Sequence, residues 1–283
     1  MIEKHFPGLP AHSIEAILTD GLWNDIYVIN GELTLRIAKS EQAKEPLDRE
    51  CRLLALIRRE TGIPVPDMRL LEHGVACYPY IAGVPLFRHR LLRLDGHRQT
   101  ALMRKLGEYM RQLHQIPSSL IKEHGISTSP VSSENLYKHL TASYEKIKRE
   151  LYPHMRSYTR ACVDAAFKGL ENGEDWFRYE PCLIHADLGL EHILLDENYE
   201  NIVGIIDFGN AGTGDPAFDL GILLDNLGEG LTARMADAYP GLETLLERAR
   251  VGLCAAGWHI RGMETGDLFW HLAHMMTAKD ILY

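Results

Sequence analysis

Apolar residues form three short runs between Cys182 and Asp207, and polar turns separate these runs. The runs are Cys182–His185, His192–Leu195 and Ile202–Asp207. Branched apolar residues bounded by Asp, Asn and Gly are typical of short buried strands. The stretch 196–201 between the second and third runs has the composition of a hairpin turn. We therefore predict an antiparallel hairpin over 192–207.

This hairpin places chemically active side chains together. In antiparallel pairing, the residue that enters a hairpin lies beside the residue that leaves it. Here those residues are His192 and Asp207, and the loop that leads to them carries Asp187. One end of a small sheet is thus predicted to carry an imidazole and two carboxylates, which is the composition of a functional site and not of a core.

The N-terminal part of the chain is predicted to form strands and one helix. Asn30-Gly31 is a tight-turn dipeptide between two strand-like runs, 25–29 and 33–37. In 45–60, apolar residues recur at helical spacing, which predicts an amphipathic helix. Strands are expected near 68–72 and 75–83, and we place a domain boundary at Ala82-Gly83. This boundary divides the chain into 1–82 and 83–283.

The rest of the chain is predicted to be mostly helical, apart from the hairpin. Helical spacing of apolar residues predicts the helices 97–115, 134–172 (broken by Pro153), 220–227, 242–259 and 267–282. The fold class is therefore α+β, with a small β-rich first part and a larger helical second part.

Composition narrows the class of protein. The chain has 283 residues, of which 46% are hydrophobic, and its formal net charge is -9. The acidic balance disfavours nucleic acid or an anionic membrane as a partner, and it is compatible with a cationic small substrate. We see no signal peptide and no apolar stretch long enough to span a bilayer. Five cysteines without C-x-x-C spacing indicate reduced thiols and a cytoplasmic setting.

Three motifs at fitting distances resemble a known family. They are His185-Ala186-Asp187 followed by His192, then Ile206-Asp207-Phe208-Gly209, then Asp215-Pro216-Ala217-Phe218-Asp219. Together they resemble the catalytic core of the aminoglycoside phosphotransferase family, whose fold is similar to that of protein kinases. At position 192 this chain has His where the protein-kinase motif has Asn. In this feature it resembles the aminoglycoside 2''-phosphotransferases and the macrolide kinases. The resemblance implies a two-lobed kinase-like fold with a nucleotide-binding N-lobe and a catalytic, substrate-binding C-lobe.

The resemblance also implies roles for the hairpin residues. Asp187 would orient the acceptor hydroxyl and take its proton, and His192 and Asp207 would hold Mg²⁺. Imidazole departs from the oxygen ligands that Mg²⁺ prefers, so His192 could also act through water. His185 is expected to anchor the catalytic loop, and Asp219 to brace its backbone. Asp215 before Pro216 has the pattern of a helix N-cap.

On the nucleotide side, the resemblance implies that Arg36 pairs with phosphates and that Glu50 steers it. Lys39 competes with Arg36 for this role. Tyr80 and Ile81 would offer their backbone to the nucleotide base. The segment 19–25 stands where kinases have a glycine-rich loop, but it contains one glycine, so an ordinary hairpin turn is an equal interpretation.

The resulting hypothesis is a small-molecule kinase that uses ATP or GTP and Mg²⁺ on a hydroxyl of an aminoglycoside-like antibiotic. Acidic residues near the C-terminus would receive ammonium groups or simply face solvent: Asp225, Glu229, Glu264 and Asp267. A macrolide, or a metabolite such as choline, homoserine or a sugar, is an alternative acceptor, and an inactive nucleotide-binding module is a third reading. His271 and His274 have metal-ligand spacing without a third ligand, which favours a place on the pocket wall.

Overall fold

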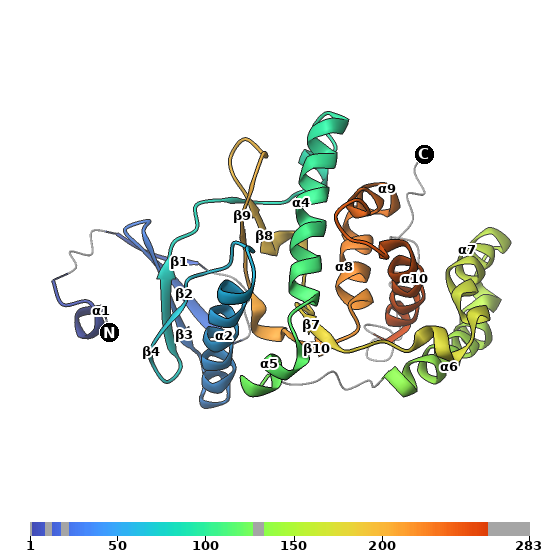
Figure 1. Ribbon diagram of the computed structural model, residues 1–283, viewed down its shortest axis with the longest axis horizontal. Coiled ribbons are helices and arrows are strands. Elements are labelled where there is room, and N and C mark those ends of the chain that lie inside the picture. The colour runs from blue at the N-terminus through green and yellow to red at the C-terminus, as the bar shows by residue number, and fades with distance from the viewer. Residues whose placement is uncertain (1, 9–12, 18–22, 127–132, 260–283) are drawn as a thin grey trace.

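The computed structural model describes residues 2–8, 13–17, 23–126 and 133–259 (Figure 1). The predicted helix 267–282, including His271 and His274, lies outside these residues, as do Glu264 and Asp267 and positions 19–22 of the segment compared with a glycine-rich loop. The first part of the described chain contains two helices and five strands, in the order α1 (Ile2–His5), β1 (Ile14–Ile17), β2 (Asn24–Ile29), β3 (Leu33–Ala38), α2 (Glu41–Glu60), β4 (Arg69–Glu72) and β5 (Val75–Pro79).

These five strands form one antiparallel sheet, in the order β1-β2-β3-β5-β4. The predicted hairpin is present, with Ile29 opposite Leu33 across the turn. Asn30 and Gly31 both have positive φ, 56° and 69°, which is the backbone that a tight hairpin turn requires. The β-rich first part of the chain is therefore confirmed.

Helix α2 packs against this sheet and begins earlier than we predicted. It starts at Glu41 and not near Glu45, although Pro46 lies inside it. Pro46 lies past the first turn, so it removes the N–H that would bond to the Gln42 carbonyl and interrupts the helical hydrogen bonds there. Ala43, in the added turn, is buried. The predicted apolar stripe is buried as well, as Leu47, Cys51, Leu54 and Ile57 show.

The second part of the chain is largely helical, as predicted. Its α-helices and strands are, in chain order, β6 (Val84–Pro85), α3 (Arg88–Leu91), α4 (Gly96–His114), α5 (Ser118–Glu123), α6 (Ser133–Glu150), α7 (Ser157–Phe167), β7 (Cys182–Ile184), β8 (Ile193–Leu195), β9 (Ile202–Ile205), β10 (Gly212–Gly214), α8 (Ala217–Leu227), α9 (Glu229–Thr232) and α10 (Leu242–His259). Six short 3₁₀ turns lie among them, η1 (Tyr152–His154), η2 (Lys168–Asn172), η3 (Glu174–Phe177), η4 (Leu190–His192), η5 (Phe208–Asn210) and η6 (Ala233–Met235). Pro153 lies in η1, where the chain breaks between α6 and α7.

The hairpin predicted over 192–207 is formed by β8 and β9, with Ile193 opposite Ile205. Strand β7 pairs with β10 in a separate ribbon, and β6 pairs with β8. His192 and Asp207 lie just outside the strands, because 3₁₀ turns replace the strand ends there. The ladder continues by one bond, in which the Ile206 N–H donates to the His192 carbonyl at 2.9 Å.

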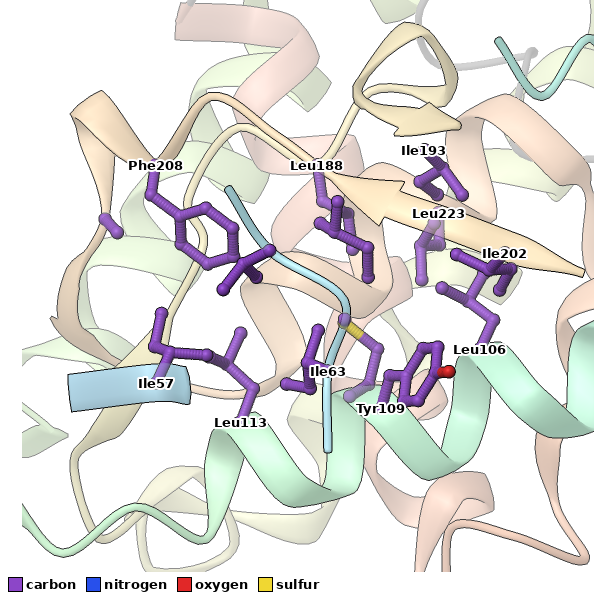
Figure 2. Close-up of a cluster of buried hydrophobic side chains, with 14 of the residues drawn as sticks. Ile57, Ile63, Leu106, Tyr109, Leu113, Leu188, Ile193, Ile202, Phe208 and Leu223 are labelled. Carbon is purple, nitrogen blue, oxygen red and sulfur yellow. The ribbon is translucent and has the colours of Figure 1, made fainter. Parts of the chain in front are cut away.

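One hydrophobic core joins the two parts of the chain. Figure 2 shows Ile57 of α2, Leu113 of α4 and Phe208 of η5 meeting in this core, with Ile193 of β8 farther along it. Full burial of such a side chain contributes about 1.5–3 kcal/mol. Helix α2 is therefore held in place by the same core that supports the hairpin. A second cluster packs α6 and α7 against α10.

Within the described part of the chain, no helix combines the length and the apolarity needed to cross a membrane.

Candidate active site

His192 and Asp207 meet at the mouth of the β8–β9 hairpin. His192 Nε2 lies 3.4 Å from Asp207 Oδ2. The other ring nitrogen, Nδ1, donates to the Asp187 carbonyl at 2.7 Å, because a carbonyl can only accept. In the neutral ring this leaves the Nε2 lone pair facing Asp207, which is the arrangement of many metal-binding histidines.

The buried ring of His185 packs under the loop that carries Asp187. Its ring is completely buried, accepts from the Asp187 N–H at Nδ1 (3.3 Å) and faces the Ile206 carbonyl with Nε2 (3.0 Å). Both contacts are satisfied by one neutral tautomer with the proton on Nε2. Burial lowers the pKa of His185 below its ordinary value, which favours this neutral form. The ring also lies 4.4 Å from that of Phe208. These contacts fit the anchoring role expected for His185.

Asp219 of α8 holds the backbone of the same loop. Its two oxygens accept from the N–H groups of His185 and Ala186, both at 2.8 Å. Ala186 has a left-handed backbone with φ 64°, which costs a residue with a Cβ about 1–2 kcal/mol. The carboxylate of Asp219 therefore offsets strain in the loop that carries Asp187.

His114 of α4 completes this arrangement, whereas its place in the sequence, on a core helix, favoured packing over chemistry. Its Nε2 lies 3.1 Å from Asp219 Oδ2, and its Nδ1 lies 2.8 Å from the hydroxyl of Tyr239. Burial opposes ionisation of Asp219, but the hydrogen bond from His114 and the two nearby imidazoles hold its pKa below the usual range. The only sequence signal was a histidine at the end of a core helix, and that signal is common in helices without such a role.

Arg36 reaches the same site from the N-terminal sheet. Its Nη1 donates to Glu50 Oε1 at 2.8 Å, and its Nη2 lies 4.0 Å from Asp207 Oδ1. Burial works against its charge, but Glu50 and Asp207 raise the pKa of the guanidinium above its ordinary value. Lys39, the competing candidate, instead lies 3.7 Å from Asp25 at the surface. The structure thus brings Arg36, and not Lys39, to the hairpin residues.

The turn after β9 has an unusual backbone. Asp207 has φ 65°, and η5 follows it directly. Such conformations cluster at functional sites, where surrounding structure enforces them. Phe208 is buried behind the turn, and Arg49 of α2 donates from Nη2 to the Gly209 carbonyl at 3.0 Å. Arg49 is a second contributor that the sequence analysis missed, because it stands beside Glu50 with no motif of its own.

The two residues expected to meet the nucleotide base differ in their backbone contacts. The Tyr80 N–H donates to the Glu32 carbonyl at 2.7 Å, so it is already engaged. The Ile81 N–H has no acceptor among the residues that the structure describes. The Ile81 side chain packs close to Gly204 of β9. Of the two, Ile81 therefore has the backbone donor that remains available.

Two acidic positions have arginine partners that the sequence did not indicate. Asp215 Oδ1 accepts from the Ala217 N–H at 2.9 Å, as an N-cap would, but it also binds Arg248 Nη2 at 2.7 Å. Glu229 is held by Arg250, with both carboxylate oxygens at 2.6 Å from Nε and Nη2. A carboxylate in such a bidentate pair is already neutralised. Glu229 is therefore a poor receptor for a substrate ammonium group.

Comparison with known proteins identifies relatives of this fold. A family model described as the phosphotransferase enzyme family matches residues 16–251. Uncharacterized protein YcbJ of Bacillus subtilis (strain 168) is 25% identical over 212 residues, which are 72% of this chain and 66% of that protein. The match thus spans just under two thirds of that relative's length.

Solved structures agree over nearly the whole chain. The GDP and kanamycin complex of APH(2'')-IIIa is 24% identical with a TM-score of 0.73, covering 98% of this chain and 95% of that one. The apoenzyme of macrolide 2'-phosphotransferase MphH from Brachybacterium faecium is 19% identical with a TM-score of 0.68, covering 99% and 95%. These similarities confirm the kinase-like fold class predicted from the motifs.

Proposed function

The chain belongs to the phosphotransferase enzyme family and is therefore a kinase, and from this premise we propose that it moves the γ-phosphate of ATP or GTP to a hydroxyl of a small molecule. In this proposal Asp187 is the catalytic base, and His192 and Asp207 hold Mg²⁺. The observation that carries it is the convergence of an imidazole, a carboxylate and a buried guanidinium beside the loop of Asp187, with His192 and Arg36 both at Asp207.

The reaction needs positioning more than covalent chemistry. The acceptor oxygen attacks the γ-phosphorus, and its proton passes to the Asp187 carboxylate. The bond from the γ-phosphorus to the bridging oxygen breaks, and its electron pair leaves with the nucleoside diphosphate. Asp187 is half-buried at the surface of its loop, so an acceptor can reach it.

The donor set fits a divalent cation. The Asp207 carboxylate is a hard oxygen ligand, and the Nε2 of His192 lies 3.4 Å from it with its lone pair exposed by the Nδ1 contact. One carboxylate suits Mg²⁺, and the imidazole suits Mn²⁺ as well. When bound, the ion supplies positive charge that offsets the phosphate oxygens. The further oxygen ligands would come from the nucleotide and from water.

Arg36, Glu50 and the segment after β5 are the proposed nucleotide contacts. Arg36 carries a permanent charge, and its buried Nε has no partner in the described structure. Glu50 fixes the direction of the guanidinium through the 2.8 Å contact. The free N–H of Ile81 is the better of the two expected donors to the base, because the Tyr80 N–H is occupied. Support for a nucleotide substrate also comes from the GDP in the similar structure.

For the acceptor, we propose an aminoglycoside-like antibiotic, which would make the activity one of antibiotic resistance. The support is the likeness in fold to a kanamycin complex. The bidentate pair of Glu229 with Arg250 removes one acidic candidate for ammonium binding. The alternative acceptors are a macrolide or a metabolite such as choline, homoserine or a sugar.

The experiment compares the wild type with Asp187→Ala. Purified protein with Mg²⁺ and either ATP or GTP is offered a panel of aminoglycosides, macrolides, choline, homoserine and sugars, and phosphate transfer is measured. Asp187→Ala is expected to lower kcat by about 10²–10⁴-fold and to leave nucleotide affinity nearly unchanged. An Asp187→Ala variant as fast as the wild type would remove Asp187 from the mechanism. Nucleotide binding by the wild type without any transfer would favour the inactive module.

A further inference from the structure

The backbone of Asp187 is held by more hydrogen bonds than its side chain. Its backbone is held by three contacts, since its N–H donates to His185 Nδ1 and its carbonyl accepts from His192 Nδ1 and from the Gly189 N–H at 2.9 Å. Its side-chain carboxylate has one hydrogen bond among the described residues, from Asn210 Nδ2 to Oδ2 at 3.0 Å. The orientation of the carboxylate therefore depends on Asn210.

The route by which Asn210 reaches this carboxylate is built into the turn after β9. The left-handed backbone at Asp207 reverses the chain, and η5 brings Asn210 back toward the catalytic loop. The Ala211 N–H closes the turn on the Phe208 carbonyl at 3.0 Å, and Arg49 holds the Gly209 carbonyl. The residue before Asn210 is thus fixed from α2, although the Asn210 side chain itself is exposed.

A base that takes a proton from an acceptor must present one oxygen in a defined direction. The last torsion of an aspartate is broad, so a carboxylate without a donor samples several directions. A neutral amide donor occupies Oδ2 without adding a charge, and it leaves Oδ1 for the acceptor hydroxyl. A carboxylate in place of the amide would repel Asp187 and could not donate.

We propose that Asn210 is a positioning residue that holds the Asp187 carboxylate with Oδ1 directed toward the acceptor. This role rests on the proposed function of Asp187 as the base. Asn210 of the η5 turn thus acts through Asp187. Oδ2 of Asp187 accepts from Asn210, and Oδ1 is left for the acceptor hydroxyl.

The test compares Asn210→Ala with Asn210→Asp, which keeps the shape of asparagine but not its donor. The control is Asn201→Ala at the far end of the same hairpin, where Asn201 Nδ2 makes a similar contact to Asp196 Oδ2 at 2.7 Å. We expect Asn210→Ala to lower kcat by about 10- to 100-fold with the nucleotide KM within about 2-fold, because misdirected reacting groups lose rate at this scale. Asn210→Asp should be at least as slow, and Asn201→Ala should match the wild type.

A crystal structure of Asn210→Ala gives a readout that does not depend on turnover. The Asp187 carboxylate is expected to leave its orientation or to occupy more than one. The proposal is overturned if Asn210→Asp keeps the wild-type kcat, because shape alone would then suffice. It is equally overturned if Asp187 keeps its orientation in the alanine variant. Should the wild type transfer no phosphate to any acceptor or to water, the proposed function fails, and the crystal structure decides the positioning role alone.

Discussion

At the scale of single residues, the buried ion pair of Glu50 with Arg36 is expected to affect both stability and nucleotide binding. Its side chain is 2% exposed and pairs with Arg36, which is 9% exposed. Glu50→Ala removes the hydrogen-bonded partner of a buried guanidinium and leaves it with Asp207 at 4.0 Å, and breaking a buried pair typically costs about 3–5 kcal/mol. We expect a fall of this size in the free energy of unfolding, measured with urea, and a nucleotide KM raised at least about 10-fold.

The control for this prediction is Glu60→Ala, on the same helix but paired with Arg59 at the surface. Exposed pairs contribute at most about 1 kcal/mol, so this variant should resemble the wild type. Equal stabilities for the two variants would contradict the role given to the buried pair.

His185 makes stability depend on pH. Its pKa in the folded protein lies below the unfolded value of about 6.5, because burial disfavours the charged ring. Between these two values the unfolded chain binds a proton that the folded chain does not, so stability is full above about pH 7 and falls as the pH falls. The slope for one such group is at most about 1.4 kcal/mol per pH unit.

The measurement is urea unfolding of the wild type and of His185→Asn between pH 8 and pH 5. The variant is less stable at pH 8, where it lacks the hydrogen bond to Ile206, and its stability should fall less steeply with pH. Parallel slopes for the two proteins would show that His185 does not titrate in this way.

At the scale of elements, His114 ties α4 to α8 and to the loop of Asp187. His114→Phe removes the hydrogen-bond partner of the buried Tyr239 hydroxyl and one of the partners of the buried Asp219 carboxylate, which keeps the His185 and Ala186 N–H groups. Leaving such groups unsatisfied costs about 1–3 kcal/mol. We expect a loss of this size, together with faster hydrogen exchange at the His185 and Ala186 amides that Asp219 holds. Gln115→Ala, at the exposed C-cap of the same helix, is the control. Unchanged amide exchange in His114→Phe would show that the tie does not reach the loop.

At the scale of the whole molecule, the two parts of the chain share one core. Ile57 of α2 packs in the cluster that also contains Leu113 and Phe208 (Figure 2). Ile57→Ala is expected to cost about 2–5 kcal/mol and to shift a single unfolding transition for the whole protein. Circular dichroism and the fluorescence of the tryptophans should report the same midpoint. Two separate midpoints would show that the parts unfold independently.

The sequence by itself determined the elements and the motif residues. Local patterns sufficed for the Asn30-Gly31 turn, the apolar stripe of α2, the break at Pro153 and the β8–β9 hairpin, because turn chemistry and periodicity act over a few neighbours. The family resemblance added the fold class and the residues of the hairpin mouth, and both the fold class and the family membership are confirmed. The roles of Asp187, His192, Asp207, Arg36, Glu50, Tyr80 and Ile81, and the boundary at Ala82-Gly83, stay predictions.

Only the tertiary structure decided which distant groups meet. The pairing of β7 with β10, the contact of His114 with Asp219 across 105 positions and that of Asn210 with Asp187 have no local signal. The same holds for Arg49, Arg248 and Arg250, which look like ordinary charges on helices. Their partners are set by how the helices pack on the common core. The order of residues does not specify the distances between remote segments, whereas packing does. The motif residues could therefore be recognised from the sequence, and the groups that hold them in place could not.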